Sequence, residues 1–259
     1  MTFGLLDLPA PLFDLIDSAL QMVLPALVRL VLYATLCAWV MMYVYLRLSD
    51  QAVLADTRAE IIRTRRALTE HAGDFAELNG LIRRNLRASL RQLGLTLWPA
   101  LIASLPMLFA LPWLSNRFDL EAPAAGTLVQ VCAHPSTDAA TLRWQNANAS
   151  YSGESGCWQL AWPTADMPVV LQDANGGALC SLSASTRSDI VHKFTLYNWL
   201  IANPGGYLPD SARFDGISIA LPTLEIIHLG PSWLRGWEPW FFAPLFLASI
   251  AFKLRWRVL

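Results

Sequence analysis

Enzyme signatures are absent from this chain of 259 residues. It contains no GxSxG elbow, HExxH zinc motif, P-loop, GxGxxG motif or CxxC pair. His134, His192 and His228 are far apart in the sequence and have no helical i,i+4 partner. We therefore interpret them as surface or packing residues and not as metal ligands. We therefore predict a non-enzyme with no catalytic residue, no metal site and no cofactor. An enzyme acting on an envelope substrate is the least favoured alternative.

Charge is also scarce, and it is segregated. Charged residues make up only 15% of the chain, whereas apolar residues make up 54%, eleven residues are tryptophan and the mean hydropathy is positive. A soluble domain of this length normally intersperses its charges over the surface. The composition therefore predicts an α-helical integral membrane protein with a soluble portion.

Three apolar segments are the candidate transmembrane helices: residues 22–46, 93–114 and 237–254. At ~1.5 Å per residue the first segment covers roughly 37 Å, more than a hydrocarbon core of ~30 Å. The third has only the 14 apolar residues Pro239–Phe252, roughly 21 Å of helix, before Lys253. Snorkelling of the lysine ammonium to the interface extends that short span.

Two features interrupt the apolar segments. Arg29 lies near the start of the first one, either at the outer interface or inside the membrane facing a hydrated cavity. Pro99, Pro106 and Pro112 lie in the second, where each removes a backbone donor. These prolines indicate either simple kinks or the wall of a wet groove.

The charges outside these segments predict a topology. Residues 47–91 contain nine arginines and six acidic residues, and the tail 255–259 is basic. Residues 1–21 carry three acidic and no basic side chains, while 115–238 has eleven acidic and six basic ones. Because positive charge stays on the cytoplasmic side, we expect the hairpin 47–92 and the tail in the cytoplasm. The N-terminus and residues 115–236 then lie outside a bacterial inner membrane.

The arginine-rich segment shows helical periodicity on two arms. Leu54, Thr57, Ile61, Thr64, Leu68 and His71 form one seam, and Phe75, Leu78, Ile82, Leu86, Leu90 and Leu93 form the other, separated by Gly73 and Asp74. This spacing predicts a cytosolic antiparallel coiled-coil hairpin. Its arginines are candidates for contact with a partner or with anionic lipid headgroups: Arg63, Arg65, Arg66, Arg83, Arg84 and Arg87. Interleaved acids and the membrane tether argue against nucleic acid.

The external parts are predicted to be mixed in structure. Residues 1–21 should form an amphipathic helix on the outer membrane surface. The external segment should form a β-rich domain, with a hairpin turn at Asp173–Gly177 and a short apolar helix over Ile190–Ala202. Its strand-like runs are Thr127–Ala133, Thr141–Gln145, Cys157–Trp162, Val169–Gln172, Leu179–Leu182 and Ile217–Leu221. In an oxidising space, two of Cys132, Cys157 and Cys180 can pair.

The order of these elements resembles the conserved core of the YidC-type membrane protein insertases and of their three-span relatives. The resemblance covers residues 10–114 and 237–259, and it is one of architecture without a diagnostic motif. It implies that Arg29 attracts acidic segments of an incoming chain in a groove formed by the three spans. It also implies that the hairpin recruits substrate or ribosome. The β-rich insertion takes the place of a further pair of spans in the bacterial family.

Two functions follow as expectations. The first is an insertase-like protein that contacts the lipid bilayer and nascent membrane proteins, and that lowers the cost of moving polar groups into the bilayer. The alternative is a non-catalytic scaffold or assembly subunit of an envelope complex. In that role the hairpin binds a cytosolic partner and the β-rich domain binds a periplasmic partner.

Overall fold

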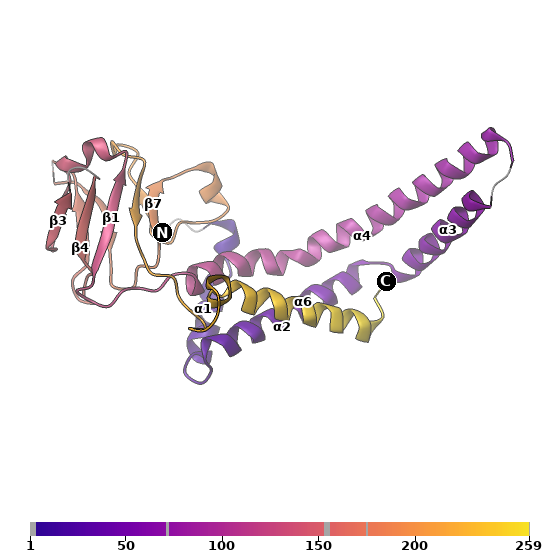
Figure 1. The fold of residues 1–259 in the computed structure, drawn as a ribbon, viewed down its shortest axis with the longest axis horizontal. Coiled ribbons are helices and arrows are strands. Elements are labelled where there is room, and N and C mark those ends of the chain that lie inside the picture. The colour runs from indigo at the N-terminus through magenta and orange to yellow at the C-terminus, as the bar shows by residue number, and fades with distance from the viewer. Residues whose placement is uncertain (1–3, 71–72, 153–155, 175, 259) are drawn as a thin grey trace. The chain divides into compact units, whose positions relative to one another are not determined.

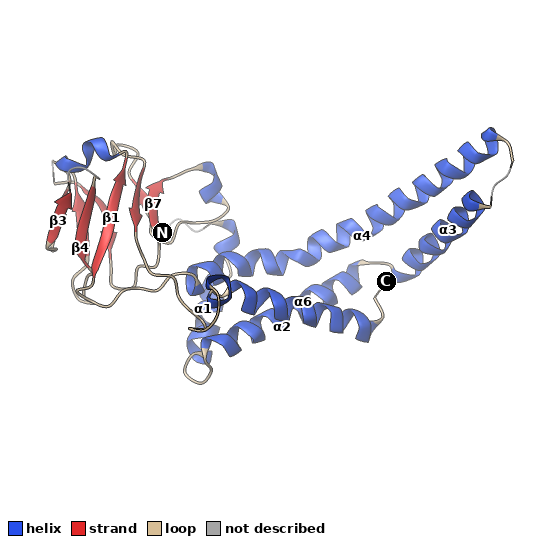
Figure 2. Cartoon of the chain, in the orientation of Figure 1, coloured by secondary structure: helices blue, strands red, loops and turns tan. Residues whose placement is uncertain are grey.

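The computed structural model of the chain describes residues 4–70, 73–152, 156–174 and 176–258 (Figure 1). About 53% of the described residues are helical, and the remainder includes a β-sheet region (Figure 2). Two compact units are present: a β-rich unit made of residues 1–24 and 109–237, and a helical unit made of residues 25–108 and 238–259. This agrees with the predicted combination of apolar helices and a β-rich module.

Four helices build the helical unit: α2 (Ala26–Leu48), α3 (Gln51–Thr69), α4 (Phe75–Phe118), which continues into the β-rich unit, and α6 (Glu238–Trp256). α2 and α6 pack against each other along their lengths. The buried stripe of α2 is Leu30, Ala34 and Ala38, and α6 buries Phe241 and Leu245. Small residues one helical turn apart allow two helix backbones to approach closely, which is the usual packing of membrane helices.

Two of the described helices are long and apolar enough to cross a membrane, α2 and α4. α4 is unbroken from the hairpin through Pro99, Pro106 and Pro112. α6 has 19 residues, contains Pro244 and ends with Lys253 and Arg255 in its last turn, and it does not meet the same criterion. The third span therefore stays a prediction.

The helix α3 agrees with the seam expected for the first arm. Asp50 caps its N-terminus by accepting hydrogen bonds from the N–H groups of Ala52 and Val53 at 3.1 Å. The buried positions of α3 are Leu54, Thr57, Ile61 and Thr64. His71, the last residue of that predicted seam, lies outside the described residues. These buried positions agree with the predicted seam on α3, and the coiled-coil pairing of the two arms stays a prediction.

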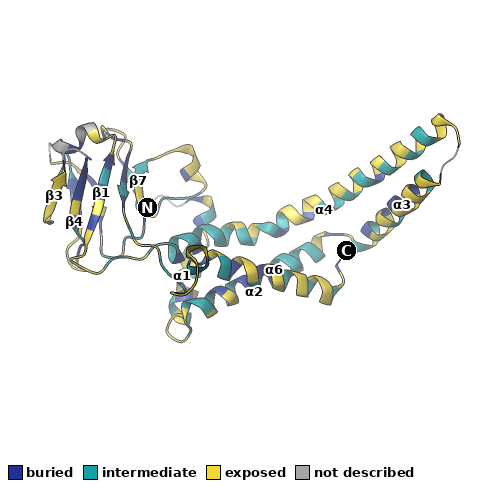
Figure 3. Ribbon diagram, viewed as in Figure 1, coloured by how far each residue is buried: buried dark blue, intermediate teal, exposed yellow. Residues whose placement is uncertain are grey.

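The seam expected on the second arm is wrong for five of its six residues, and only Leu78 is partly buried. Ile82, Leu86, Leu90 and Leu93 are exposed, as is Phe75. Figure 3 shows much of this arm of α4 as exposed. The buried positions of this arm are Ala88 and Pro99, and the positions intermediate in exposure include Leu78, Leu81, Asn85, Gln92 and Leu95. This second set also recurs at spacings of three and four residues. The arm therefore carries two helical stripes. The more polar one, which contains Asn85 and Gln92, is the more buried, and the one made of Ile82, Leu86, Leu90 and Leu93 is exposed.

The β-rich unit opens with η1 (Leu5–Asp7) and α1 (Ala10–Leu20), which confirms the predicted N-terminal helix. It also contains η2 (Ser136–Thr141), η3 (Leu196–Trp199) and α5 (Ser232–Arg235). Its strands are β1 (Leu128–His134), β2 (Arg143–Gln145), β3 (Ala149–Ser152), β4 (Cys157–Ala161), β5 (Val169–Gln172), β6 (Ala178–Leu182), β7 (Ile190–Lys193), β8 (Tyr207–Leu208) and β9 (Gly216–Ile219).

These strands form two sheets that share one hydrophobic core. The larger has the order β3-β4-β1-β9-β7-β8, antiparallel except for the β7–β8 pair, and the smaller has the order β2-β5-β6. Val131 and Ile217 of the first sheet and Leu171 and Leu182 of the second belong to the same fully buried cluster. Burial alternates along β1 and β5, one strand of each sheet, as in a small β-sandwich.

The six predicted strands all appear, with ends shifted by up to two residues. The predicted helix over Ile190–Ala202 is wrong: its first residues form β7, which pairs with β9 and β8, and only Leu196–Trp199 are helical, as a 3-10 turn. At the β5–β6 connection, Asp173 accepts a hydrogen bond from the Gly177 N–H at 2.7 Å, as expected of a hairpin turn. Asn175 of that turn lies outside the described residues.

Candidate functional site

Arg29, the predicted groove residue, lies in the first turn of α2. The helix begins at Ala26 after Pro25, whose carbonyl oxygen accepts a hydrogen bond from the Arg29 N–H at 3.2 Å. Arg29 is half-buried. It lies 18 positions before Arg47 on the same helix, which at ~1.5 Å per residue is roughly 27 Å. Because a hydrocarbon core is ~30 Å thick, a spanning α2 places these two arginines near opposite membrane surfaces.

The six candidate arginines of the hairpin are all exposed, three on α3 and three on α4. Arg84 Nε lies 3.1 Å from Glu60 Oε1, an ion pair that joins α4 to α3. Both side chains are well exposed, and exposed pairs contribute only about 0–1 kcal/mol. The arginines therefore form a cationic surface available to a partner, and they add little to the stability of the hairpin.

Beside these arginines, α4 carries an exposed apolar stripe. We call it the α4 stripe: Ile82, Leu86, Leu90, Leu93 and Leu97, each about half exposed. Their spacing of three and four residues places them along one side of the helix, next to Arg83 and Arg87. A stripe of this kind on a helix arm is typical of a contact with another helix or with a lipid surface.

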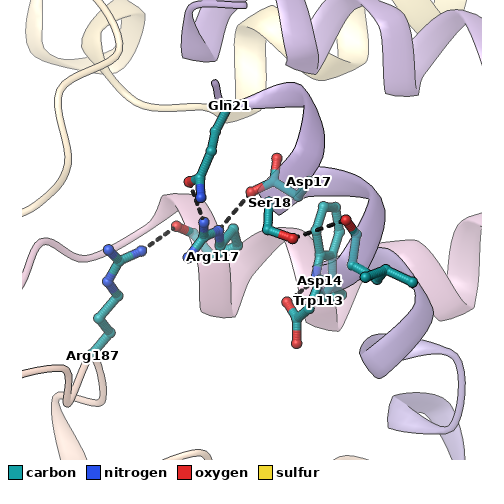
Figure 4. A network of polar contacts seen from close by, with 8 residues as sticks. Asp14, Asp17, Ser18, Gln21, Trp113, Arg117 and Arg187 are labelled. Carbon is teal, nitrogen blue, oxygen red and sulfur yellow. Dashed lines mark hydrogen bonds and ion pairs between the residues drawn. The ribbon is translucent and has the colours of Figure 1, made fainter. Parts of the chain in front are cut away.

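A polar cluster that sequence reasoning missed lies in the β-rich unit, where α1 meets the end of α4 (Figure 4). Arg117 Nε donates to Asp17 Oδ2 at 2.8 Å, and its Nη2 donates to Gln21 Oε1 at 2.8 Å. One turn away, Trp113 Nε1 donates to Asp14 Oδ1 at 2.8 Å. The Asp17 side chain is fully buried. This cluster attaches the N-terminal helix α1 to the last turns of α4.

A second arginine, Arg187, connects the cluster to the segment just before strand β7. Arg187 Nη1 donates to the backbone oxygen of Arg117 at 3.1 Å (Figure 4). Burial, and then the positive charge of Arg117, lower the pKa of the Arg187 guanidinium. An arginine still stays protonated at any physiological pH, so Arg187 adds one fixed positive charge beside the Arg117–Asp17 ion pair. A cavity of about 230 Å³ beside it is lined by polar and apolar residues of the same unit, and its polar residues include Arg187, Asp189 and His192.

The three external cysteines separate into one disulfide and one thiol. Cys132 of β1 and Cys157 of β4 are cross-strand partners and form the disulfide, which decides the pairing that the sequence left open. Cys180 on β6 is free and partly buried against the hydrophobic core. Burial raises the pKa of Cys180 to about 12, although a backbone hydrogen bond with Leu171 lowers it in part.

The Cys180 thiol is therefore expected to be unreactive in the folded protein. Because the thiolate is the nucleophile, raising the pKa from 9 to about 12 lowers the thiolate fraction at pH 8 about a thousandfold. We expect iodoacetamide to label Cys180 at least about a hundredfold more slowly in the native protein than in urea. Peptide mass spectrometry measures both rates. Rapid labelling at pH 8 without denaturant would contradict this.

The described residues contain no group of three or more His, Cys, Asp or Glu side chains placed to hold a metal ion. The fold and the clusters define a class only coarsely: a largely helical chain with apolar helices of spanning length, an arginine-rich hairpin and a β-sandwich module. No family model matches the chain, and neither does any curated protein or solved structure.

Proposed function

We propose that this chain is an integral membrane protein with three spans that assists the insertion or assembly of other membrane proteins. One observation carries the proposal. Two helices of spanning length, α2 and α4, are joined by an arginine-rich segment that folds back on itself. Both ends of that segment enter the same membrane face, and its arginines favour the cytoplasmic one. α6, packed along α2, is the third span. Its apolar part is short, and the side chains of Lys253 and Arg255 extend it to the membrane interface by snorkelling.

In this function Arg29 supplies a cation for acidic segments of a client chain. Moving an acidic side chain of the client into hydrocarbon costs several kcal/mol. A hydrated arginine beside its path lowers that cost by pairing with the negative charge. The position of Arg29 in the first turn of α2 restricts this role to the outer part of the bilayer. We therefore expect it to act on segments that cross completely, rather than on those that remain on the cytoplasmic side.

A second candidate function, that of a non-catalytic assembly subunit, is favoured by the α4 stripe. Three residues of the stripe, Ile82, Leu86 and Leu90, lie in the cytosolic hairpin beside Arg83 and Arg87, and they suit an acidic amphipathic helix of a cytosolic partner. In this function Arg29 only holds α2 at the outer interface by snorkelling.

The two functions predict different outcomes for Arg29→Ala. In proteoliposomes that contain the purified chain, we expect this variant to lower the insertion of a small single-span substrate with an acidic external segment by about tenfold, the equivalent of ~1.4 kcal/mol. Arg29→Lys keeps the charge and should retain most of the activity. Protease protection of the translocated segment measures insertion.

The matched control is Arg143→Ala, which removes an exposed cation on β2 of the β-rich unit that has no part in the proposed function. It should leave insertion unchanged. If Arg29→Ala inserts the substrate as well as wild type does, the insertase function is excluded and the scaffold function remains. In that case Leu86→Asp with Leu90→Asp, which places two acids on the α4 stripe, should be the variant that loses complex assembly.

A further inference from the structure

The β-rich unit displays large apolar side chains on a short turn between β7 and β8. In η3 and its flanks, Leu196 is 92% exposed, Trp199 is 72% exposed, and Tyr197 and Phe194 are also exposed. Figure 3 shows the turn as largely exposed. Large apolar side chains concentrated on one short loop are costly in water and mark an interaction surface.

The turn is held in a defined conformation by its one buried side chain. Asn198 Oδ1 accepts hydrogen bonds from the Thr195 N–H at 2.9 Å and from the Thr195 hydroxyl at 2.7 Å, which closes a capping box. Asn198 is itself buried. With the amide turned inward, its neighbours Tyr197 and Trp199 are left outside, so their exposure is built into the turn rather than caused by loop disorder.

The same turn is tied to the N-terminal segment of the chain. The Ala202 N–H donates to Asp7 Oδ2 at 2.7 Å, and the Leu6 N–H donates to the Leu200 oxygen at 2.9 Å. A Cβ added at Gly4 would lie 2.5 Å from the Ala202 nitrogen, so only glycine permits this approach. Figure 1 shows η1 in indigo beside the orange η3 turn. Two segments about 190 residues apart are thereby fixed to each other.

The N-terminal segment has an exposed apolar face of its own. Leu8, Leu12 and Leu15 recur at helical spacing, and Leu8 is 69% and Leu15 is 68% exposed. On the other side of α1, Asp17 is buried against Arg117. Immediately after α1 come the exposed Met22 and Val23, and then α2, a helix of spanning length.

We propose that the η3 turn and the outer face of α1 form one membrane-seating surface, with Leu196, Tyr197 and Trp199 inserted into the interfacial region of the outer leaflet. Chain continuity identifies the occupant, because α1 leads directly into α2 and is therefore held at the bilayer. Amphipathic segments with Trp and Leu settle at this depth. Residues 1–24 and 194–204 contain no Lys or Arg. Hydrophobic burial, rather than attraction to anionic headgroups, therefore drives the contact.

Spin-label accessibility in nanodiscs tests the surface with the full chain. Leu196→Cys is made in a Cys37→Ala, Cys180→Ala background and labelled with a nitroxide, and its relative accessibility to oxygen and to a nickel chelate is measured in phosphatidylcholine. Leu196 is almost fully exposed, so the substitution leaves the core intact. Leu128→Cys, an exposed position on β1 of the same unit, is the aqueous reference, and Leu36→Cys, exposed on α2, is the lipid reference.

We expect the label at position 196 to shift from the Leu128 value toward the Leu36 value, and to the same degree when anionic lipid is added. If it matches Leu128 while Leu36 reports lipid, the seating surface is overturned and a protein partner is the better occupant. The inference rests on α2 spanning the membrane, as in the proposed function. A Leu36 label that reports water would overturn that assignment, and the seating surface with it.

Discussion

Replacing Cys132 and Cys157 together by serine is expected to lower the free energy of unfolding of the β-rich unit by about 3 kcal/mol. The disulfide closes a loop of sequence separation 25 between the neighbouring strands β1 and β4. The loop-entropy model gives about this value for such a loop, because the crosslink restricts the unfolded chain. Denaturant unfolding of the detergent-solubilised chain, followed by tryptophan fluorescence, measures the loss.

Reductant provides the internal check on that prediction. Dithiothreitol should lower the stability of the wild-type chain to that of the double serine variant and should leave the variant itself unchanged. Cys37→Ser, in the helical unit, is the matched control and should respond to reductant as wild type does. A wild-type chain whose unfolding midpoint ignores reductant would show that the loop contributes nothing measurable.

Local patterns predicted the elements of this chain well where a single period dominates. On α3 the positions Leu54, Thr57, Ile61 and Thr64 were read directly from their spacing, and they are the buried ones. On the hairpin arm of α4 the period was right and the face was wrong. Hydropathy favoured Ile82 and Leu86, whereas the structure turns Asn85 and Ala88 inward. A sequence with two stripes does not say which of them is buried, because that depends on the rest of the fold.

Non-local pairing explains the other failure and the cluster that was missed. Ile190–Ala202 is apolar enough for a helix, but backbone pairing of β7 with β9 and β8 overrides that preference. Asp14 and Asp17 were visible as acids on a predicted amphipathic helix without a basic residue. Their partners Trp113 and Arg117 are about 100 residues away in the sequence. Only the fold brings the two segments together.

Asp17→Ala is expected to destabilise the β-rich unit by about 2–3 kcal/mol. Removing one partner of a fully buried ion pair costs about 3–5 kcal/mol, because the remaining charge is left desolvated. Asp17 is fully buried, but the Arg117 side chain is 29% exposed and keeps its bond to Gln21, so the cost falls below that range. Denaturant unfolding monitored by tryptophan fluorescence measures the loss.

Two controls separate the ion pair from a general effect on α1. Ser18→Ala removes a hydroxyl on the same helix that donates only to the Leu15 oxygen, so it should change stability by less than about 0.5 kcal/mol. Arg117→Ala should be destabilising alone, yet add little when combined with Asp17→Ala, because both remove the same interaction. Fully additive losses would mean that the two side chains stabilise the unit independently, and that α1 is held by its apolar contacts, such as Phe13 against Trp113.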